Sequence, residues 1–100
     1  MFYLYIIYSE SADKYYVGHS ADPEKRLIEH NSDPRSTFTH KYRPWILMAS
    51  FPVSDQRSIA LKVERYIKKM KSRKVIENLI SSVNISDIIA QAVRVPTGRD

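Results

Sequence analysis

Arg26 and His30 are the first residues whose types and spacing suggest chemistry. They lie four positions apart in the stretch "DPEKRLIEH", so a helix would place them on one face. Leu27 and Ile28 would bury the neighbouring face and put the basic pair near the edge of the packed side. Taken alone, an arginine and a histidine at this spacing usually form a solvated surface pair.

Glu64 is a carboxylate beside an apolar helical stripe. It follows Ala60 by four positions and precedes Ile67 by three, so it projects next to the face that a helix would bury. One interpretation is structural, a carboxylate neutralised by Arg65 or Lys68. The other is a metal site, because hard divalent cations prefer carboxylate oxygen. The pattern alone favours the structural interpretation.

Four tyrosines stand in two strand-like runs that also contain Gly18. Alternate residues of a strand share a face, so Tyr3 and Tyr5 point the same way and Tyr15 and Tyr16 point oppositely. Most strand tyrosines pack, with the hydroxyl reaching solvent. Gly18 shares the face of Tyr16 and has no side chain, so it opens a gap beside that ring where a backbone or ligand can approach.

The elements that must position these residues follow in the order β-β-α-β-α-α. Aromatic and β-branched runs predict strands, and helical spacing of apolar residues predicts helices. We expect an α/β fold, a small three-stranded sheet flanked by helices. The predicted strands are residues 2–8, 14–19 and 45–53, and the predicted helices are about 22–30, 55–70 and 73–82.

Capping residues mark where each predicted helix starts. Asp22 followed by Pro23 suits the first helix, because aspartate caps and proline fits the first helical position. Ser54 or Asp55 is expected to cap the second helix, and Ser72 the third. Between the first helix and the third strand we expect a long polar loop.

Composition limits the classes of function. The net charge of +5 indicates an anionic partner. The chain has no cysteine, which excludes disulfides and thiolate metal sites and fits a reducing compartment such as the cytoplasm. No apolar run approaches the ~20 residues that a membrane span needs, so we expect no membrane partner.

Five segments in order resemble the GIY-YIG nuclease family, and the resemblance covers about residues 2–80. The resemblance is closest to its small single-domain branch, similar to the N-terminal catalytic domain of the nucleotide-excision-repair incision subunit. The family's first motif falls on Tyr3-Leu4-Tyr5, with Tyr3 in place of glycine, and its second on Tyr16-Val17-Gly18. The segments are "YLYII" at 3–7, "YYVG" at 15–18, "DPEKRLIEH" at 22–30, "RPW" at 43–45 and "ALKVERYIKKMKSRK" at 60–74.

The resemblance implies a metal-dependent endonuclease that hydrolyses DNA by direct water attack, with little sequence specificity and a role in DNA repair. It implies that Gly18 keeps the sheet surface open for the scissile phosphate, that His19 or His30 relays a proton, and that Asn78 helps bind phosphate. Which tyrosine takes the proton from water stays open. Glu64 would hold one Mg²⁺ or Mn²⁺ ion, at the base of one basic cleft. The implied catalytic residues are Tyr5, Tyr16, Arg26, His30 and Glu64.

Basic residues of the last matched segments are expected to contact the nucleic-acid backbone, although a basic helix face is often only solvated. Tyr42, Arg43 and Trp45 would stack on or position a base, with Trp45 equally suited to the core. The predicted backbone-binding residues are Lys62, Arg65, Lys68, Lys69, Lys71, Arg73, Lys74 and Arg43.

The expected partner is branched or single-stranded DNA, bound by a monomer without a small-molecule cofactor. Residues 1–82 would form the nuclease-like domain and 83–100 a C-terminal extension, a short helix followed by a frayed tail. One alternative is a weakly active or non-catalytic nucleic-acid-binding module that keeps the nuclease fold. Another is a protein-interaction domain without affinity for nucleic acid.

Overall fold

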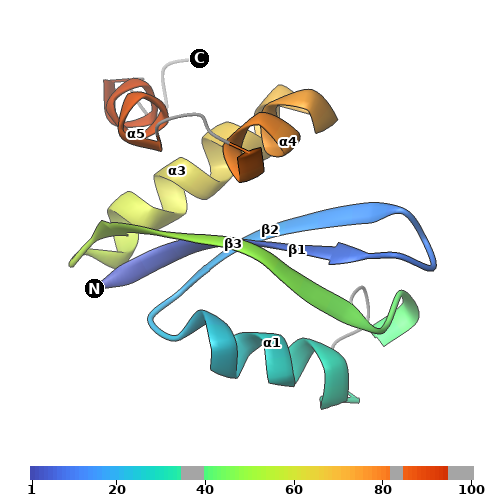
Figure 1. Cartoon of the computed structure of the whole chain (residues 1–100). Coiled ribbons are helices and arrows are strands. Elements are labelled where there is room, and N and C mark those ends of the chain that lie inside the picture. The colour runs from blue at the N-terminus through green and yellow to red at the C-terminus, as the bar shows by residue number, and fades with distance from the viewer. Residues whose placement is uncertain (35–39, 82–84, 95–100) are drawn as a thin grey trace.

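The computed structural model describes residues 1–34, 40–81 and 85–94 of the chain. It confirms an α/β fold with a three-stranded sheet (Figure 1). In chain order the elements are β1 (Phe2–Ser9), β2 (Lys14–Ser20), α1 (Pro23–Ser32), β3 (Trp45–Ser54), α3 (Arg57–Met70), α4 (Arg73–Ser81) and α5 (Ile85–Arg94).

The sheet is antiparallel in the order β2-β1-β3, so β1 is central and β2 is an edge strand. The first two predicted strands are confirmed, and they pair as an antiparallel hairpin with Tyr5 opposite Gly18 and Ile7 opposite Tyr16. Cross-strand partners share a face of the sheet. Tyr16 and Gly18 share a face, as the alternation in the sequence predicts, and the strand pairing adds Tyr5 to that face.

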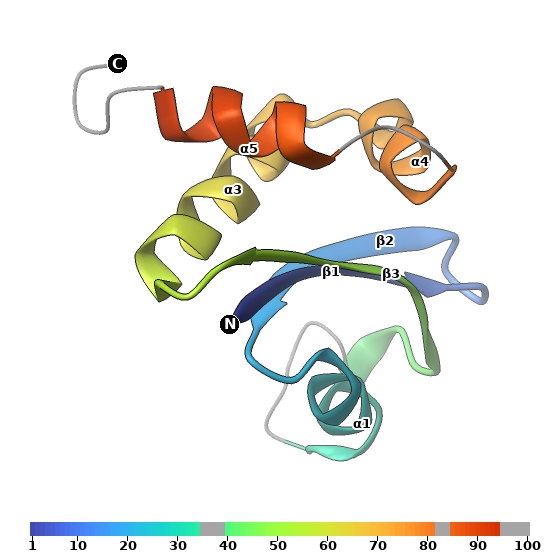
Figure 2. The ribbon, with the colours of Figure 1, turned by 60° about the vertical axis from the view of Figure 1, so that its left-hand side comes forward.

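Helices cover both faces of the sheet. α1 packs on one face, and α3, α4 and α5 pack on the other (Figure 2). On the α1 face, Tyr5, Ile7 and Trp45 form a small buried cluster. The larger core lies between the opposite face and the three helices, and its buried members are Leu4, Ile6, Val17, Val63, Ile67, Leu79 and Ala92.

The capping predictions hold at two helices and fail at one. Asp22 Oδ1 accepts a hydrogen bond from Lys25 N at 3.2 Å, and Ser72 Oγ accepts one from Val75 N at 3.3 Å. The prediction that Ser54 or Asp55 caps the second long helix is wrong. α3 begins at Arg57 after Gln56, which makes no side-chain capping bond. The Ser54 hydroxyl instead accepts from Gln56 N within the preceding turn.

The buried face of α1 differs from the predicted one. Ile28 is 65% exposed, whereas His30 is 1% exposed. The interpretation of His30 as half of a solvated pair is therefore wrong. Packing over the aromatic face of the sheet rotates His30, together with Leu27, inward. This rotation turns a surface histidine into a candidate site residue.

The C-terminal helix is longer than the short helix that the sequence predicts. α5 has ten residues, and its Ala92 lies in the same core as Val63 and Leu79. A domain boundary at residue 82 would divide this packing, and the expected frayed tail lies outside the described residues. Within the described ranges, no helix is long and apolar enough to cross a membrane.

Candidate active site

Tyr5 and His30 form a buried polar pair between β1 and α1. The Tyr5 hydroxyl and His30 Nε2 lie 2.8 Å apart. Both side chains are about as buried as the apolar core, with 1% exposure each. His30 Nδ1 has no hydrogen-bond partner among the described residues. The tyrosine hydroxyl is thus the polar contact that orients the imidazole ring.

Gly18 makes room for Tyr5. A Cβ atom at residue 18 would lie 2.5 Å from Tyr5 Oη and 2.6 Å from Cζ. The sequence predicts that the missing side chain leaves a gap beside Tyr16 for a phosphate or backbone. That prediction is wrong, because the phenol of the paired strand fills the space. The glycine serves the placement of a tyrosine and leaves no open surface above itself.

Tyr16 extends the aromatic cluster toward the edge of the sheet. Its ring centroid lies 5.1 Å from that of His30 and 6.3 Å from that of Trp45, both with edge-on geometry. Trp45 is 3% exposed, so its side chain belongs to the core and does not stack on a base. Tyr16 is only half-buried, and of the two candidate tyrosines it is the one that solvent reaches.

Burial, together with nearby charges, determines the protonation of the pair formed by Tyr5 and His30. Burial, and then the charge of Tyr16, raise the pKa of Tyr5 far above its ordinary value, with Arg26 opposing and Glu64 adding to the rise. Burial and then the positive charge of Arg26 lower the pKa of His30 to about 4. At neutral pH the phenol is therefore protonated and the imidazole uncharged.

Arg26 stands at the first turns of α1 beside both tyrosines. Burial lowers its pKa, but a hydrogen bond to Glu29 and the charges of Tyr5, Glu29 and Tyr16 outweigh burial and leave it raised. Arg26 Nη1 donates to Glu29 Oε1 at 3.0 Å, and the arginine side chain is 40% exposed. A guanidinium carries five N–H donors, so the bond to Glu29 leaves others for a ligand.

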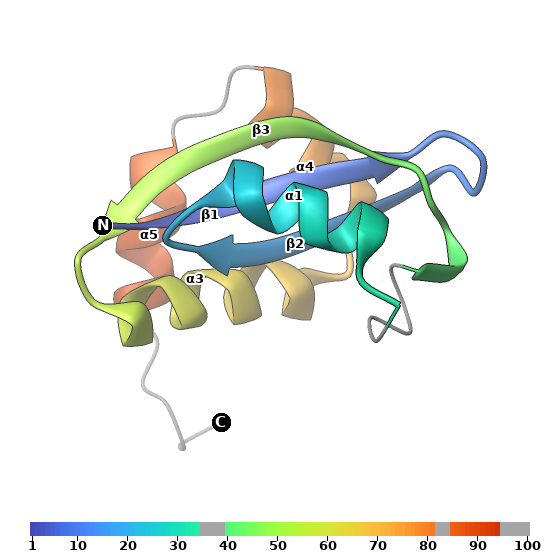
Figure 3. The same cartoon turned by 90° about the horizontal axis from the view of Figure 1, so that it is seen from below.

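Glu64 reaches the same edge from the opposite layer. Figure 3 shows α3 running along the β2 edge of the sheet. His19 Nδ1 lies 2.7 Å from Glu64 Oε1, and Lys68 Nζ donates to Oε2 at 2.9 Å. The Lys68 ammonium also lies 4.9 Å from the centre of the Tyr16 ring. Side chains from both layers thus meet around the outer edge of β2.

The five predicted catalytic residues can now be placed relative to one another. Tyr5 is hydrogen-bonded to His30, and Tyr16, Arg26 and Glu64 act electrostatically on its hydroxyl, so the other four residues lie within electrostatic or hydrogen-bond reach of Tyr5. They do not line one open cleft with Glu64 at its base, because Tyr5 and His30 are buried. The cleft prediction is therefore wrong in its shape.

The residues at this edge suit one mode of metal coordination and not another. Among the described residues no group of three or more histidine, cysteine or acidic side chains could hold an ion. An all-protein cage is therefore not formed there. Mg²⁺ commonly keeps several waters and uses one or two carboxylates together with substrate phosphates. Glu64, whose side chain is 14% exposed, fits that mode once Lys68 leaves its Oε2 atom.

Among the predicted nucleic-acid contacts, two guanidinium groups are held by other parts of the chain. Arg43 Nε donates to His30 O at 2.7 Å, and its Nη2 donates to Asp33 O, so this guanidinium fastens the end of α1. Arg73 pairs with Asp13 at 2.5 Å and with Glu77 at 3.2 Å. Arg73 is nevertheless exposed, and Lys68 is both exposed and paired with Glu64. The other exposed side chains of the predicted set are Arg65, Lys69, Lys71 and Lys74, and Lys62 is half-buried.

Asn78 is absent from the candidate site although the sequence predicts it there, and Lys14 is present although the sequence does not predict it. Asn78 is exposed on α4, a helix that packs over the face of the sheet opposite to Tyr5 and His30. Lys14, which sequence reasoning missed, opens β2 and lies 5.0 Å from the centre of the Tyr42 ring. The signal that could have found it is its place two residues before Tyr16 on the same strand face.

Comparison with protein families assigns the chain. The model of the GIY-YIG catalytic domain matches residues 1–77. The chain belongs to the GIY-YIG family. Comparison with curated proteins gives no significant match. Membership of the GIY-YIG family implies a nuclease-type function, and the matched region contains all five clustered residues.

Proposed function

We propose that the protein is a metal-dependent endonuclease that hydrolyses phosphodiester bonds in DNA by direct attack of water. The observation that supports this most is the meeting of two phenols, a guanidinium, an imidazole and a carboxylate at the β2 edge of a GIY-YIG domain. Phosphodiester hydrolysis needs charge stabilisation at the phosphate and a path for the proton of water. This set of side chains offers both.

Arg26 binds the scissile phosphate in this proposal. Its guanidinium is partly exposed and holds Glu29 through one nitrogen. The remaining N–H groups match the spacing of two phosphate oxygens, a geometry that lysine lacks. Because the arginine also lies within electrostatic reach of Tyr5 and Tyr16, a phosphate bound there would lie beside both phenols.

The Tyr5–His30 pair supplies the path for the proton. The raised pKa of Tyr5 means that its phenol keeps a proton at neutral pH and cannot act as a free phenolate. His30 is uncharged, since its pKa is lowered to about 4, and its Nε2 lies 2.8 Å from the phenol oxygen. As water attacks phosphorus and the bond from phosphorus to the leaving oxygen breaks, Tyr5 accepts the water proton and passes its own proton to His30, while the leaving oxygen takes a proton from solvent. Tyr16, the more exposed phenol, orients the water.

Glu64 is the residue that would hold the divalent ion, Mg²⁺ or Mn²⁺. Bound there and to the phosphate, such an ion would neutralise charge that develops on the phosphate oxygens. His19 keeps Glu64 oriented through its contact with Oε1 and leaves Oε2 to the exchangeable Lys68. We propose little sequence specificity, because backbone contacts carry no sequence information.

A plasmid-nicking assay tests the proposal. Supercoiled DNA is incubated with the protein and Mg²⁺ or Mn²⁺, and in parallel with EDTA. Nicking that needs the metal supports the endonuclease. Salt-dependent binding without nicking would favour a nucleic-acid-binding module that keeps the fold. Neither binding nor nicking would favour a protein-interaction domain. Action in DNA repair stays a prediction that this assay does not address.

A further inference from the structure

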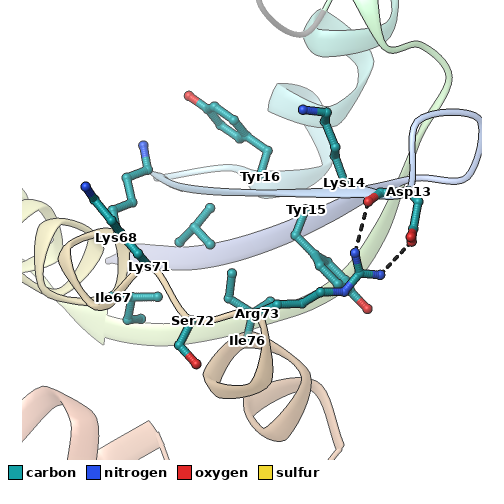
Figure 4. Close-up of a pocket in the computed structure, with 11 residues that line it drawn as sticks. Asp13, Lys14, Tyr15, Tyr16, Ile67, Lys68, Lys71, Ser72, Arg73 and Ile76 are labelled. Atoms are coloured by element: carbon teal, nitrogen blue, oxygen red, sulfur yellow. Dashed lines mark hydrogen bonds and ion pairs between the residues drawn. The ribbon is translucent and has the colours of Figure 1, made fainter.

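A cavity of about 400 Å³ opens beside the candidate active site, between β2 and the junction of α3 and α4 (Figure 4). Sites for small ligands commonly measure roughly 300–1,000 Å³, so this one accepts a group the size of a nucleotide. Tyr16 and Lys68 line the cavity and also belong to the side chains that surround the β2 edge. The cavity therefore adjoins the place where Arg26 would hold the scissile phosphate.

The lining of the cavity is apolar at its floor and cationic at its rim. Val17, Ile67 and Ile76 supply aliphatic surface, and all three also pack in the large core or against it. Figure 4 shows the ammonium groups of Lys14, Lys68 and Lys71 on the same side as the Tyr16 ring. A single phosphate would make no contact with the apolar floor, and a purely apolar ligand would not interact with the charges of the lysines.

The rim lysines differ in how they are engaged. Lys68 is paired with Glu64, whereas Lys14 and Lys71 make no ion pair with any residue that the structure describes. Arg73 does not add a free charge, because Asp13 and Glu77 hold its guanidinium. Lys14 and Lys71 are thus the two cations of the rim that a phosphate can take without breaking an ion pair.

We propose that this cavity holds one unpaired nucleotide of the strand that is cut, next to the scissile phosphate, with its base on the apolar floor and its phosphate at Lys14 and Lys71. The assignment of a strand to be cut depends on the proposed nuclease function, whereas the nucleotide site does not. Grooves for single strands combine positive charge along the backbone with apolar or aromatic surface for bases. A paired base must first leave its stack, which costs a few kcal/mol. The cavity therefore selects single-stranded or branched DNA over intact duplex.

Binding measured without cleavage tests the cavity. Fluorescence anisotropy in EDTA compares a single-stranded oligothymidylate with a duplex, using wild type and the double variant Lys14→Gln, Lys71→Gln. The control is Lys25→Gln, Arg94→Gln, which removes two exposed charges outside the cavity lining. We expect the cavity variant to bind the single strand at least tenfold more weakly than the control does. Its slope of log affinity against log salt should fall by about 0.7 for each phosphate that the variant no longer binds.

A second measurement follows the floor of the cavity. The methyl NMR signals of Val17, Ile67 and Ile76 should shift when the oligothymidylate is added and should shift less in the cavity variant. Unmoved methyl signals, equal affinities of the two variants, or no single-strand binding at low salt would each overturn the cavity proposal and leave nicking untouched. Binding in the cavity by a protein that nicks no DNA would support the cavity and refute the nuclease.

Discussion

Replacing Gly18 by alanine should destabilise the protein through a contact with Tyr5. The new Cβ would lie 2.5 Å from Tyr5 Oη and 2.6 Å from Cζ, distances that side chains do not tolerate. Tyr5 is 1% exposed on the central strand, and its hydroxyl is held by His30. The ring therefore cannot retreat without breaking the buried hydrogen bond.

The contact reverses the usual sign of the substitution. Glycine inside a strand is ordinarily less stable than alanine by roughly 0.5–1 kcal/mol, so an unobstructed change would stabilise the fold. Forcing a methyl group into a packed core costs roughly 1–3 kcal/mol. Loss of the hydrogen bond between Tyr5 and His30 adds about 1 kcal/mol. The net expectation for Gly18→Ala is a loss of about 1–3 kcal/mol, or roughly 5–20 °C in Tm for a domain of this size.

Thermal and urea unfolding measure this loss directly. The matched control is Ser50→Ala, because Ser50 faces Tyr5 across the other strand pair and is exposed. We expect the control to stay within about 0.5 kcal/mol of wild type. The double variant with Tyr5→Phe should recover only part of the loss, because the contact with Cζ remains. A Gly18→Ala protein as stable as wild type, or more stable, would refute this account of the glycine.

Three further perturbations probe other parts of the site. Because the pKa of His30 is about 4 when folded and 6.5 ordinarily, the unfolded chain binds more protons between these values. The free energy of unfolding should therefore fall as pH drops through that window, by about 3 kcal/mol at most. In pH-dependent unfolding, His30→Gln should flatten this slope. An unchanged slope would contradict the lowered pKa of His30. Arg43→Ala should cost about 1–3 kcal/mol in thermal unfolding without changing the salt slope of DNA binding, because its donors hold carbonyl groups of α1. Lys68→Met should tighten Mn²⁺ binding in calorimetry by about 1.5- to 5-fold, since the Lys68 ammonium competes with the metal ion for the Glu64 carboxylate. Weaker Mn²⁺ binding would contradict this competition.

Local signals in the sequence predict most of the fold. Aromatic and β-branched runs predict β1 and β2, and Asp22 with Pro23 predicts the start of α1. Each of these signals depends only on residues that are close together in the sequence. The start of α3 is predicted less well, because Ser54 can bond either to a helix or to its own turn, and the turn wins.

Long-range packing decides what the sequence does not. The burial of His30 depends on how α1 rotates over Tyr5 and Tyr16, and four-residue spacing cannot report that rotation. The role of Arg43 depends on carbonyl groups ten or more positions away. Lys68 on α3 contacts Tyr16 of β2 around the edge of the sheet. Sequence periodicity describes each helix or strand by itself, so it does not predict a contact between the two layers. The resemblance to the family brings these residues together before any packing is known, without their geometry.

The central claim is that the side chains at the β2 edge hydrolyse phosphodiester bonds with Glu64 as the metal ligand. The most direct measurement compares single-turnover nicking by wild type, Glu64→Gln and Glu10→Gln in saturating Mg²⁺ or Mn²⁺. Glu10 is exposed in the turn after β1, so its variant matches the chemical change away from the site. We expect Glu64→Gln to nick about 100-fold more slowly or worse, and Glu10→Gln to match wild type. Equal rates for all three proteins would contradict the claim.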